Sequence, residues 1–195
     1  MAEREEAGRP GYSEGRDALL DATVRVVAEH GLRGLTYRRV AEAARTTHGL
    51  VSYHFGSRDA LILEAAERAN AESLEGTSLD APPQRAEDFA RELPERAARL
   101  ADDHAFQFEL AIEARRRPDL RDGVRERYDG YLASAREALR ALGIDLGDEE
   151  DAAARLLFAA VDGLMLQQLV FEDPDRTRES LAVLQRLLAE LQDRG

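Results

Sequence analysis

Arginine side chains gather around one short segment of the chain, residues 47–55. They lie on both sides of it: Arg38, Arg39, Arg45 and Arg58. Guanidinium groups bind phosphate oxygens, and a hydroxyl or imidazole group at the start of a helix can reach the edge of a base. Thr47 and His48 stand at such a start. These residue types predict recognition of a nucleic acid rather than catalysis.

The surrounding stretch, residues 34–61, has the pattern of two short helices joined by a tight turn. Thr36 is a good N-cap for the first helix, and Thr47 can cap the second, which ends before Gly56. Ser57 then caps a new helix. A helix as brief as the second is unstable alone, so we expect a probe that its neighbours hold rigidly, as in a helix-turn-helix element.

The same stretch resembles the TetR-like, AcrR-like bacterial transcriptional regulators over about fifty residues. The matching residues are Leu19, Ala22, Val26, Gly31, Gly34, Leu35, Thr36, Arg38, Val40, Ala41, Ala44, Gly49, Tyr53, His54, Phe55, Arg58 and Leu61. Arg45 stands where the family's turn often has glycine, Thr46 where a small apolar residue is common, and Ser52 where tyrosine is frequent. These departures concern the operator sequence and the turn geometry.

The resemblance implies which side chains meet DNA. In the major groove these would be Thr47, His48, Gly49 and Leu50; on the DNA backbone, Thr36, Tyr37, Arg38, Tyr53 and His54; and on a phosphate near the next helix, Arg58. By residue type alone, Val51 and Phe55 are expected in the core, and Arg39 as an ordinary solvated residue. His48 and His54 are off any common helical face, so no metal site is expected.

Charge is unevenly distributed along this 195-residue chain of net charge −12. Residues 1–11 carry −1, residues 12–62 carry +1, and the remainder carries −12. All 27 basic residues are arginine, and cysteine is absent. A module of charge +1 binds DNA weakly, so affinity should come from pairing two modules and from backbone N–H groups at helix starts.

The whole chain reads as an all-α fold of about nine helices, with no strand pattern. After Ser57, helices are expected over 58–74, 84–101, 103–116, 119–142, 148–171 and 174–193, with a linker at 76–83. Asp148 is expected to cap the helix over 148–171, and Asp173 with Pro174 to open the last one. We divide the chain into a flexible arm (1–11), a helix-turn-helix domain (12–57) and a ligand-binding and dimerisation domain (58–195). The charged N-terminus is no signal peptide, and no apolar run reaches the ~18 residues of a membrane span, so a cytoplasmic location is expected.

The last two long helices are apolar over more than one face. One side can pack on its own subunit and the other on a second copy, which predicts a homodimer through Leu156, Leu164, Leu184, Leu188 and Leu191. The alternative is that these helices fill the core of a monomer.

The resemblance also implies a pocket for an unidentified small-molecule effector among the middle helices. Its candidate walls are Phe89, Phe106, Phe108, Glu109, Tyr128, Tyr131, Phe158, Met165 and Gln168. Each could equally be plain core, since aromatic stripes at helical spacing usually are. Phosphate-binding, nucleophile and metalloprotease motifs are missing, so no enzyme activity, cofactor or metal is expected.

Together these features predict a homodimeric repressor that binds a palindromic double-stranded operator and is released by a small lipophilic molecule. The alternative is a DNA-binding regulator or structural protein that a partner protein controls, with no small-molecule ligand.

Overall fold

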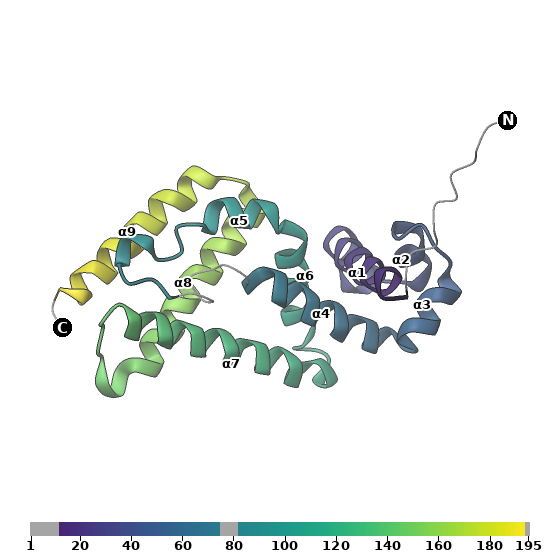
Figure 1. The fold of residues 1–195 in the computed structure, drawn as a ribbon, viewed down its shortest axis with the longest axis horizontal. Coiled ribbons are helices and arrows are strands. Elements are labelled where there is room, and N and C mark those ends of the chain that lie inside the picture. The colour runs from purple at the N-terminus through teal and green to yellow at the C-terminus, as the bar shows by residue number, and fades with distance from the viewer. Residues whose placement is uncertain (1–11, 75–81, 194–195) are drawn as a thin grey trace.

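The computed structural model describes residues 12–74 and 82–193 (Figure 1). Over these ranges every regular element is a helix, which confirms the predicted all-α class. The predicted arm at 1–11 and residues 76–81 of the predicted linker lie outside the described residues. The helices are α1 (Tyr12–Gly34), α2 (Tyr37–Ala43), α3 (His48–Phe55), α4 (Arg58–Leu74), α5 (Leu93–Arg99), α6 (Ala101–Glu113), α7 (Pro118–Ala141), α8 (Glu150–Phe171) and α9 (Pro174–Gln192), with short 3-10 turns at Ala86–Asp88 and Gly147–Glu149.

Helices α1, α2 and α3 lie at one end of the molecule, and α4 runs from them toward the larger group of helices α5–α9 (Figure 1). Helices α1, α2, α3 and α4 share a hydrophobic core, here called the first core, to which each contributes its buried apolar residues. It also takes in Phe106 and Leu110 of α6 and Leu120 at the start of α7. The apolar faces predicted for the N-terminal helices are therefore covered partly by helices from the following region.

Several predicted caps place the helix starts. The Thr36 side chain accepts a hydrogen bond from the backbone N–H of Arg39, Ser57 accepts one from Ala60 at 3.1 Å, and Asp173 accepts one from Arg176 at 3.0 Å. These bonds satisfy N–H groups that the first turn of a helix leaves without a partner. Thr47 occupies the N-cap position of α3, as predicted, but its side chain makes no capping hydrogen bond there.

Two predicted helix boundaries also change. The single helix expected over 84–101 is a 3-10 turn followed by α5, because Ala90 adopts a left-handed backbone with φ of 51° and Pro94 fixes the start of α5. Asp148, expected to cap α8, lies inside the turn Gly147–Glu149 instead. In that turn Asp145 Oδ1 accepts a hydrogen bond from the backbone N–H of Gly147 at 3.0 Å.

A second core joins α5, α7, α8 and α9. Phe89 and Leu188 are buried in it, so Leu188 packs inside its own subunit and the predicted role of Leu188 in the dimer interface is wrong. The stretch Gly147–Phe171, with a mean hydropathy of 1.4 in its most apolar window, is long and apolar enough to cross a membrane by length and composition alone. The sequence analysis looked for an uninterrupted apolar run, and this criterion misses a helix that is apolar only on average. Some of its apolar residues, Leu157, Phe158 and Met165, are buried in the second core.

Candidate nucleic-acid interface and effector site

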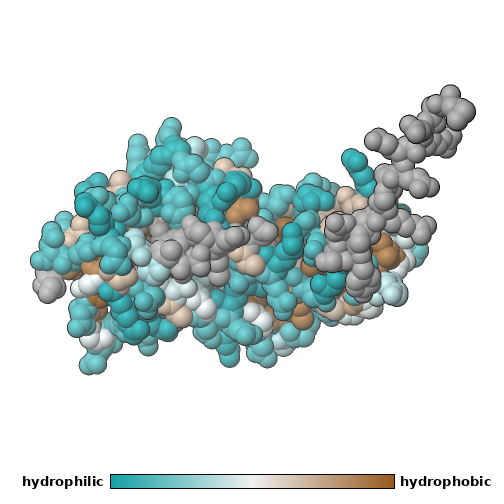
Figure 2. Space-filling view, in the orientation of Figure 1, coloured by the Kyte–Doolittle hydropathy of each residue, from teal (hydrophilic) through white to brown (hydrophobic). Residues whose placement is uncertain are grey.

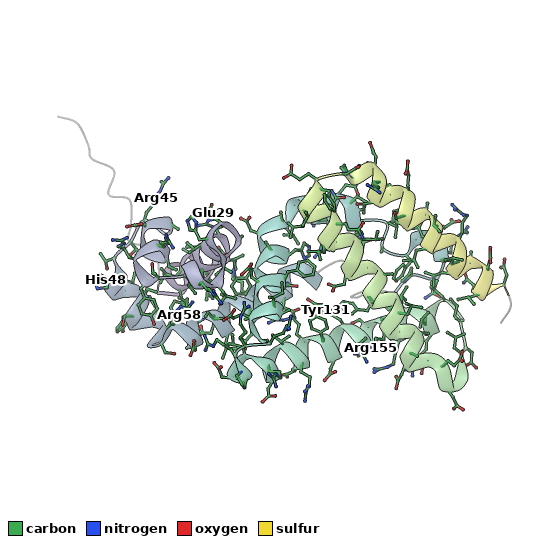
Figure 3. All side chains as sticks on the ribbon, turned by 180° about the vertical axis from the view of Figure 1, so that it is seen from behind. Glu29, Arg45, His48, Arg58, Tyr131 and Arg155 are labelled. Atoms are coloured by element: carbon green, nitrogen blue, oxygen red, sulfur yellow. The ribbon has the colours of Figure 1, made fainter. Side chains whose placement is uncertain are left out.

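Helix α3 turns its apolar side inward and presents a polar side at the end of the molecule. Val51 and Phe55 are buried in the first core, as expected from their residue types. Thr47, His48, Gly49 and Tyr53 are exposed, Tyr53 by 73%. Figure 3 shows His48 and Arg45 pointing away from the rest of the protein. Leu50 and His54 are half-buried, and Leu50 packs against the first core.

The turn before α3 is built without glycine. Arg45 has a positive φ of 53°, at the position where the family pattern often has glycine. A left-handed backbone costs a residue other than glycine about 1–2 kcal/mol. Backbone hydrogen bonds hold the turn, from Arg45 N to Glu42 O at 3.1 Å and from Thr46 N to Ala41 O at 2.8 Å. The turn thus keeps an exposed guanidinium directly before the probe helix.

Helix α2 carries two exposed arginines, one of which also bonds to the backbone of the preceding helix. Arg38 is exposed and lies 3.7 Å from Glu42, a weak surface pair that leaves it accessible. Arg39 donates a hydrogen bond from Nη1 to the carbonyl of Gly34 at 2.6 Å, so it stabilises the α1–α2 connection. Tyr37 is half-buried, and burial followed by the nearby Asp59 raises the pKa of its hydroxyl.

Arg58 has a structural role that its residue type does not reveal. Its Nε donates to the carbonyl oxygen of Leu35 at 3.2 Å, and its Nη2 donates to that of Leu32. The side chain is half-buried and lies inside the N-terminal group of helices (Figure 3). The guanidinium fixes the α1–α2 connection to the start of α4, and its contact with a phosphate stays a prediction.

Some of the predicted effector residues come together between α7 and α8. We call Tyr128, Tyr131 and Phe158 the aromatic cluster. The Tyr131 and Phe158 rings stack with centroids 5.0 Å apart, and the Tyr128 ring meets the Phe158 ring edge-on at 5.5 Å. Burial raises the pKa of Tyr131 to about 12. Its hydroxyl donates to Asn70 Oδ1 of α4 at 2.7 Å and lies 3.0 Å from Gln107 Oε1 of α6.

Other residues of the predicted pocket lie elsewhere or are already engaged. Phe106 is buried in the first core, and Phe89 is buried in the second core. Glu109 accepts a hydrogen bond from the backbone N–H of Leu32 at 3.3 Å, so it ties α6 to α1. Gln168 accepts one from the Thr177 hydroxyl at 2.5 Å, which joins α8 to α9. These four residues serve packing and helix contacts rather than a common pocket.

The remaining two predicted pocket residues, Phe108 and Met165, belong to the second core. Phe108 is half-buried against it and Met165 is buried in it.

Asp162 is a residue near the aromatic cluster that was not among the predicted contacts. It is half-buried, and burial raises the pKa of its carboxyl group. Its charge acts on the hydroxyls of both Tyr128 and Tyr131. The sequence held a signal for it, because Asp162 follows Phe158 by four positions and so lies on the same face of α8.

The outer side of α8 and α9 carries exposed apolar residues. Leu156 is 73% exposed, and the others are Leu166, Val170, Phe171, Val183 and Leu187. The predicted interface residues Leu164, Leu184 and Leu191 are half-buried beside them. In this region Gly163 has no neighbouring atom within 4 Å of a built Cβ, so another backbone could approach it closely. In the described parts of the chain, no group of three acidic, histidine or cysteine side chains could hold a metal ion.

The fold and this site define a class: an all-α protein with an N-terminal helix-turn-helix and a separate C-terminal helical domain. Two family models match the chain, "Bacterial regulatory proteins, tetR family" over residues 19–65 and "Tetracyclin repressor-like, C-terminal domain" over residues 81–190. The chain belongs to the TetR family.

Individual relatives agree with this assignment. The chain is 36% identical over 63 residues to the transcriptional repressor AcnR of Corynebacterium efficiens, covering 32% of this chain and 34% of AcnR. A TetR-family transcriptional regulator from Rhodococcus superposes with a TM-score of 0.72 at 25% identity, covering 92% of this chain and 99% of that one. The multidrug binding protein EbrR, complexed with proflavin, superposes with a TM-score of 0.54 at 30% identity, covering 89% and 99% of the two chains.

The chain matches only part of the length of these curated relatives. The match covers 34% of the length of AcnR and 27% of the length of the transcriptional regulator BetI of Burkholderia thailandensis.

Proposed function

We propose that the protein is a cytoplasmic, homodimeric transcriptional repressor that binds a palindromic operator and releases it when a small molecule enters the C-terminal domain. The observation that carries this proposal is the outward presentation of α3. Thr47, His48 and Gly49 are exposed at its start, on a helix whose opposite side is fixed in the first core. A short rigid helix offered in this way fits the major groove of DNA.

The structure supports separate roles for the side chains around α3. His48 and Thr47 have groups that can read a base edge, whereas Arg38 and Arg45 are exposed cations suited to phosphate. Tyr53 and His54 at the other end of α3 are suited to the DNA backbone. Two such modules must reach half-sites about 34 Å apart, which requires a dimer.

Release by a small molecule requires a path from the C-terminal domain to α3. Helix α4 supplies it, because Arg58 at its start holds the α1–α2 connection and Asn70 near its end bonds to Tyr131. An effector can act only through a different affinity for the two arrangements of these helices. The proflavin complex of EbrR supports a small-molecule site in this fold.

The first experiment is fluorescence anisotropy of the purified protein with the DNA upstream of its own gene, in a salt series and beside a scrambled duplex. We expect tight, salt-sensitive and sequence-selective binding with two protomers per site. Equal affinity for the scrambled duplex, in the presence and absence of cell extract, would contradict the proposal.

Two variants separate positioning from base reading in this assay. Arg38→Ala should weaken binding to every duplex and reduce the salt slope by about one, because one phosphate contact is lost. His48→Ala should change the preferred operator sequence instead. If His48→Ala lowers the affinity equally for all operator variants, its base-reading role is wrong.

A further inference from the structure

Asp162 is a half-buried carboxylate for which the described part of the chain provides neither an ion pair nor a hydrogen bond. Withdrawing a carboxylate from water without a partner is costly, and such groups occur preferentially at functional sites. Elsewhere on α8, the acidic side chains Glu150 and Asp151 are paired with Arg140 and Arg136. Asp162 therefore differs from its neighbours in having its charge uncompensated.

The surroundings of Asp162 are aromatic rather than basic. It lies one helical turn after Phe158, and its charge acts on Tyr128 and Tyr131 across the α7–α8 contact. Figure 3 shows Tyr131 in the interior between the two helices. Aromatic ring faces attract cations, and this attraction grows when water is excluded.

Arg127 is the cation that also acts on the two tyrosines. Burial lowers its pKa, and the nearby Glu67 of α4 acts in the opposite direction. Arg127 does not contribute to the pKa shift of Asp162, which has burial as its single cause. The carboxylate of Glu67 thus accompanies Arg127, and no cation of the described residues offsets the charge of Asp162.

We propose that Asp162 and the aromatic cluster recognise an organic cation, a quaternary ammonium or a flat aromatic cation. The carboxylate supplies the opposite charge, and the rings supply apolar and cation–π contacts to the same molecule. This inference rests on the proposed effector response and names the chemical class of the effector. The charge of Asp162 disfavours an anionic molecule at this site.

The test is a titration of the full chain with proflavin, followed by its fluorescence, and competition by tetraethylammonium. We expect one saturable site per chain, and the Asp162→Asn variant should bind proflavin at least tenfold more weakly. The matched control is Asp148→Asn, which removes an exposed carboxylate from the turn before α8 and should leave binding unchanged. Competition by tetraethylammonium identifies a site open to quaternary ammonium, whereas its failure restricts the site to flat aromatic cations.

Folding of Asp162→Asn is checked by its melting temperature, which should be unchanged or higher because an uncompensated charge is removed. Equal proflavin binding by Asp162→Asn and wild type would overturn the inference. So would binding that does not saturate, or equal binding of an anionic naphthalene sulfonate at the same site.

These titrations contain no DNA, so a wrong ligand class and a wrong regulatory function give different results. If proflavin binds through Asp162 but does not dissociate the operator complex, the binding site is supported and release of DNA by this ligand is refuted.

Discussion

Gly49 lies on the exposed side of α3, where an added Cβ would meet no atom of the protein within 4 Å. The fold does not require glycine there, so we attribute its presence to the close approach of DNA. Gly49→Ala should keep or slightly raise stability, since alanine favours helix by up to about 1 kcal/mol over glycine. The same variant should lose at least tenfold in operator affinity, measured by anisotropy.

The matched control is Gly130→Ala on the exposed side of α7, which also has no atom within 4 Å of the added Cβ. It should change stability similarly and leave operator affinity as in the wild type. Undiminished DNA binding by Gly49→Ala would show that α3 has room to spare at the DNA surface.

His104 on α6 makes the stability depend on pH. Burial, and then the charge of Arg96, lowers the pKa of its imidazole from 6.5 to about 4. Below pH 6.5 the unfolded chain takes up a proton that the folded chain refuses, so stability is lost as the pH falls toward 4. From pH 7 to pH 5 this loss should be about 2 kcal/mol.

Urea unfolding at the two pH values, at fixed protein concentration, measures this loss. His104→Gln should remove most of the difference, because glutamine does not titrate. An equal difference in the variant would assign the pH dependence to other groups.

Among the elements, α4 connects the two ends of the molecule through the hydroxyl of Tyr131. Tyr131→Phe keeps the ring stacked on Phe158 and removes the hydrogen bond to Asn70. We expect a stability loss of about 1 kcal/mol. Backbone hydrogen exchange near Asn70 should become faster, since the end of α4 loses an anchor.

Tyr128→Phe is the control for this prediction, because the described residues offer its hydroxyl no hydrogen bond while its ring shares the aromatic cluster. It should leave exchange in α4 unchanged. If both variants accelerate exchange equally, ring packing rather than the Tyr131 hydroxyl anchors α4.

Helix positions were predictable where capping groups and periodicity agreed. Ser57 and Asp173 cap the helices that they were expected to cap. The break before α5 was missed although Pro94 marked the helix start, because the left-handed backbone of Ala90 leaves no trace in an alanine. Local sequence thus predicts helix starts better than breaks forced by tertiary contacts.

Site residues were predictable to the extent that their partners are local. His48 and Thr47 are exposed because α3 has one apolar side, which the sequence shows. Arg58 could not be assigned, since phosphate oxygens and backbone carbonyls are both acceptors and the carbonyls of Leu32 and Leu35 come from another helix. Asp162 escaped notice because its aromatic neighbours Tyr128 and Tyr131 lie on α7.

Across the whole molecule, apolar residues are scattered among a largely hydrophilic surface in the view of Figure 2. The exposed leucines of α8 and α9 differ from these scattered residues because they lie on two helices that are adjacent in the chain. A dimer that covers them should be split by Leu156→Glu combined with Leu187→Glu, because a buried unpaired charge is strongly unfavourable. Light scattering after size exclusion should then report a monomer, and operator affinity should fall.

Ile112→Glu on α6 is the control for general loss of surface apolar area, since Ile112 is 55% exposed and lies outside α8 and α9. It should remain a dimer. If the double variant also elutes as a dimer, the interface lies on another face of the protein.

The first core has a consequence for exchanging DNA specificities between relatives. Because Phe106 and Leu110 of α6 are buried with α1 and α4, the DNA-reading end and the effector domain share side chains across the chain. A chimera that takes residues 12–57 from a relative would place a foreign α1 against these two residues. Transplanting a new operator preference therefore calls for redesign of the matching α6 surface as well as of the reading helix.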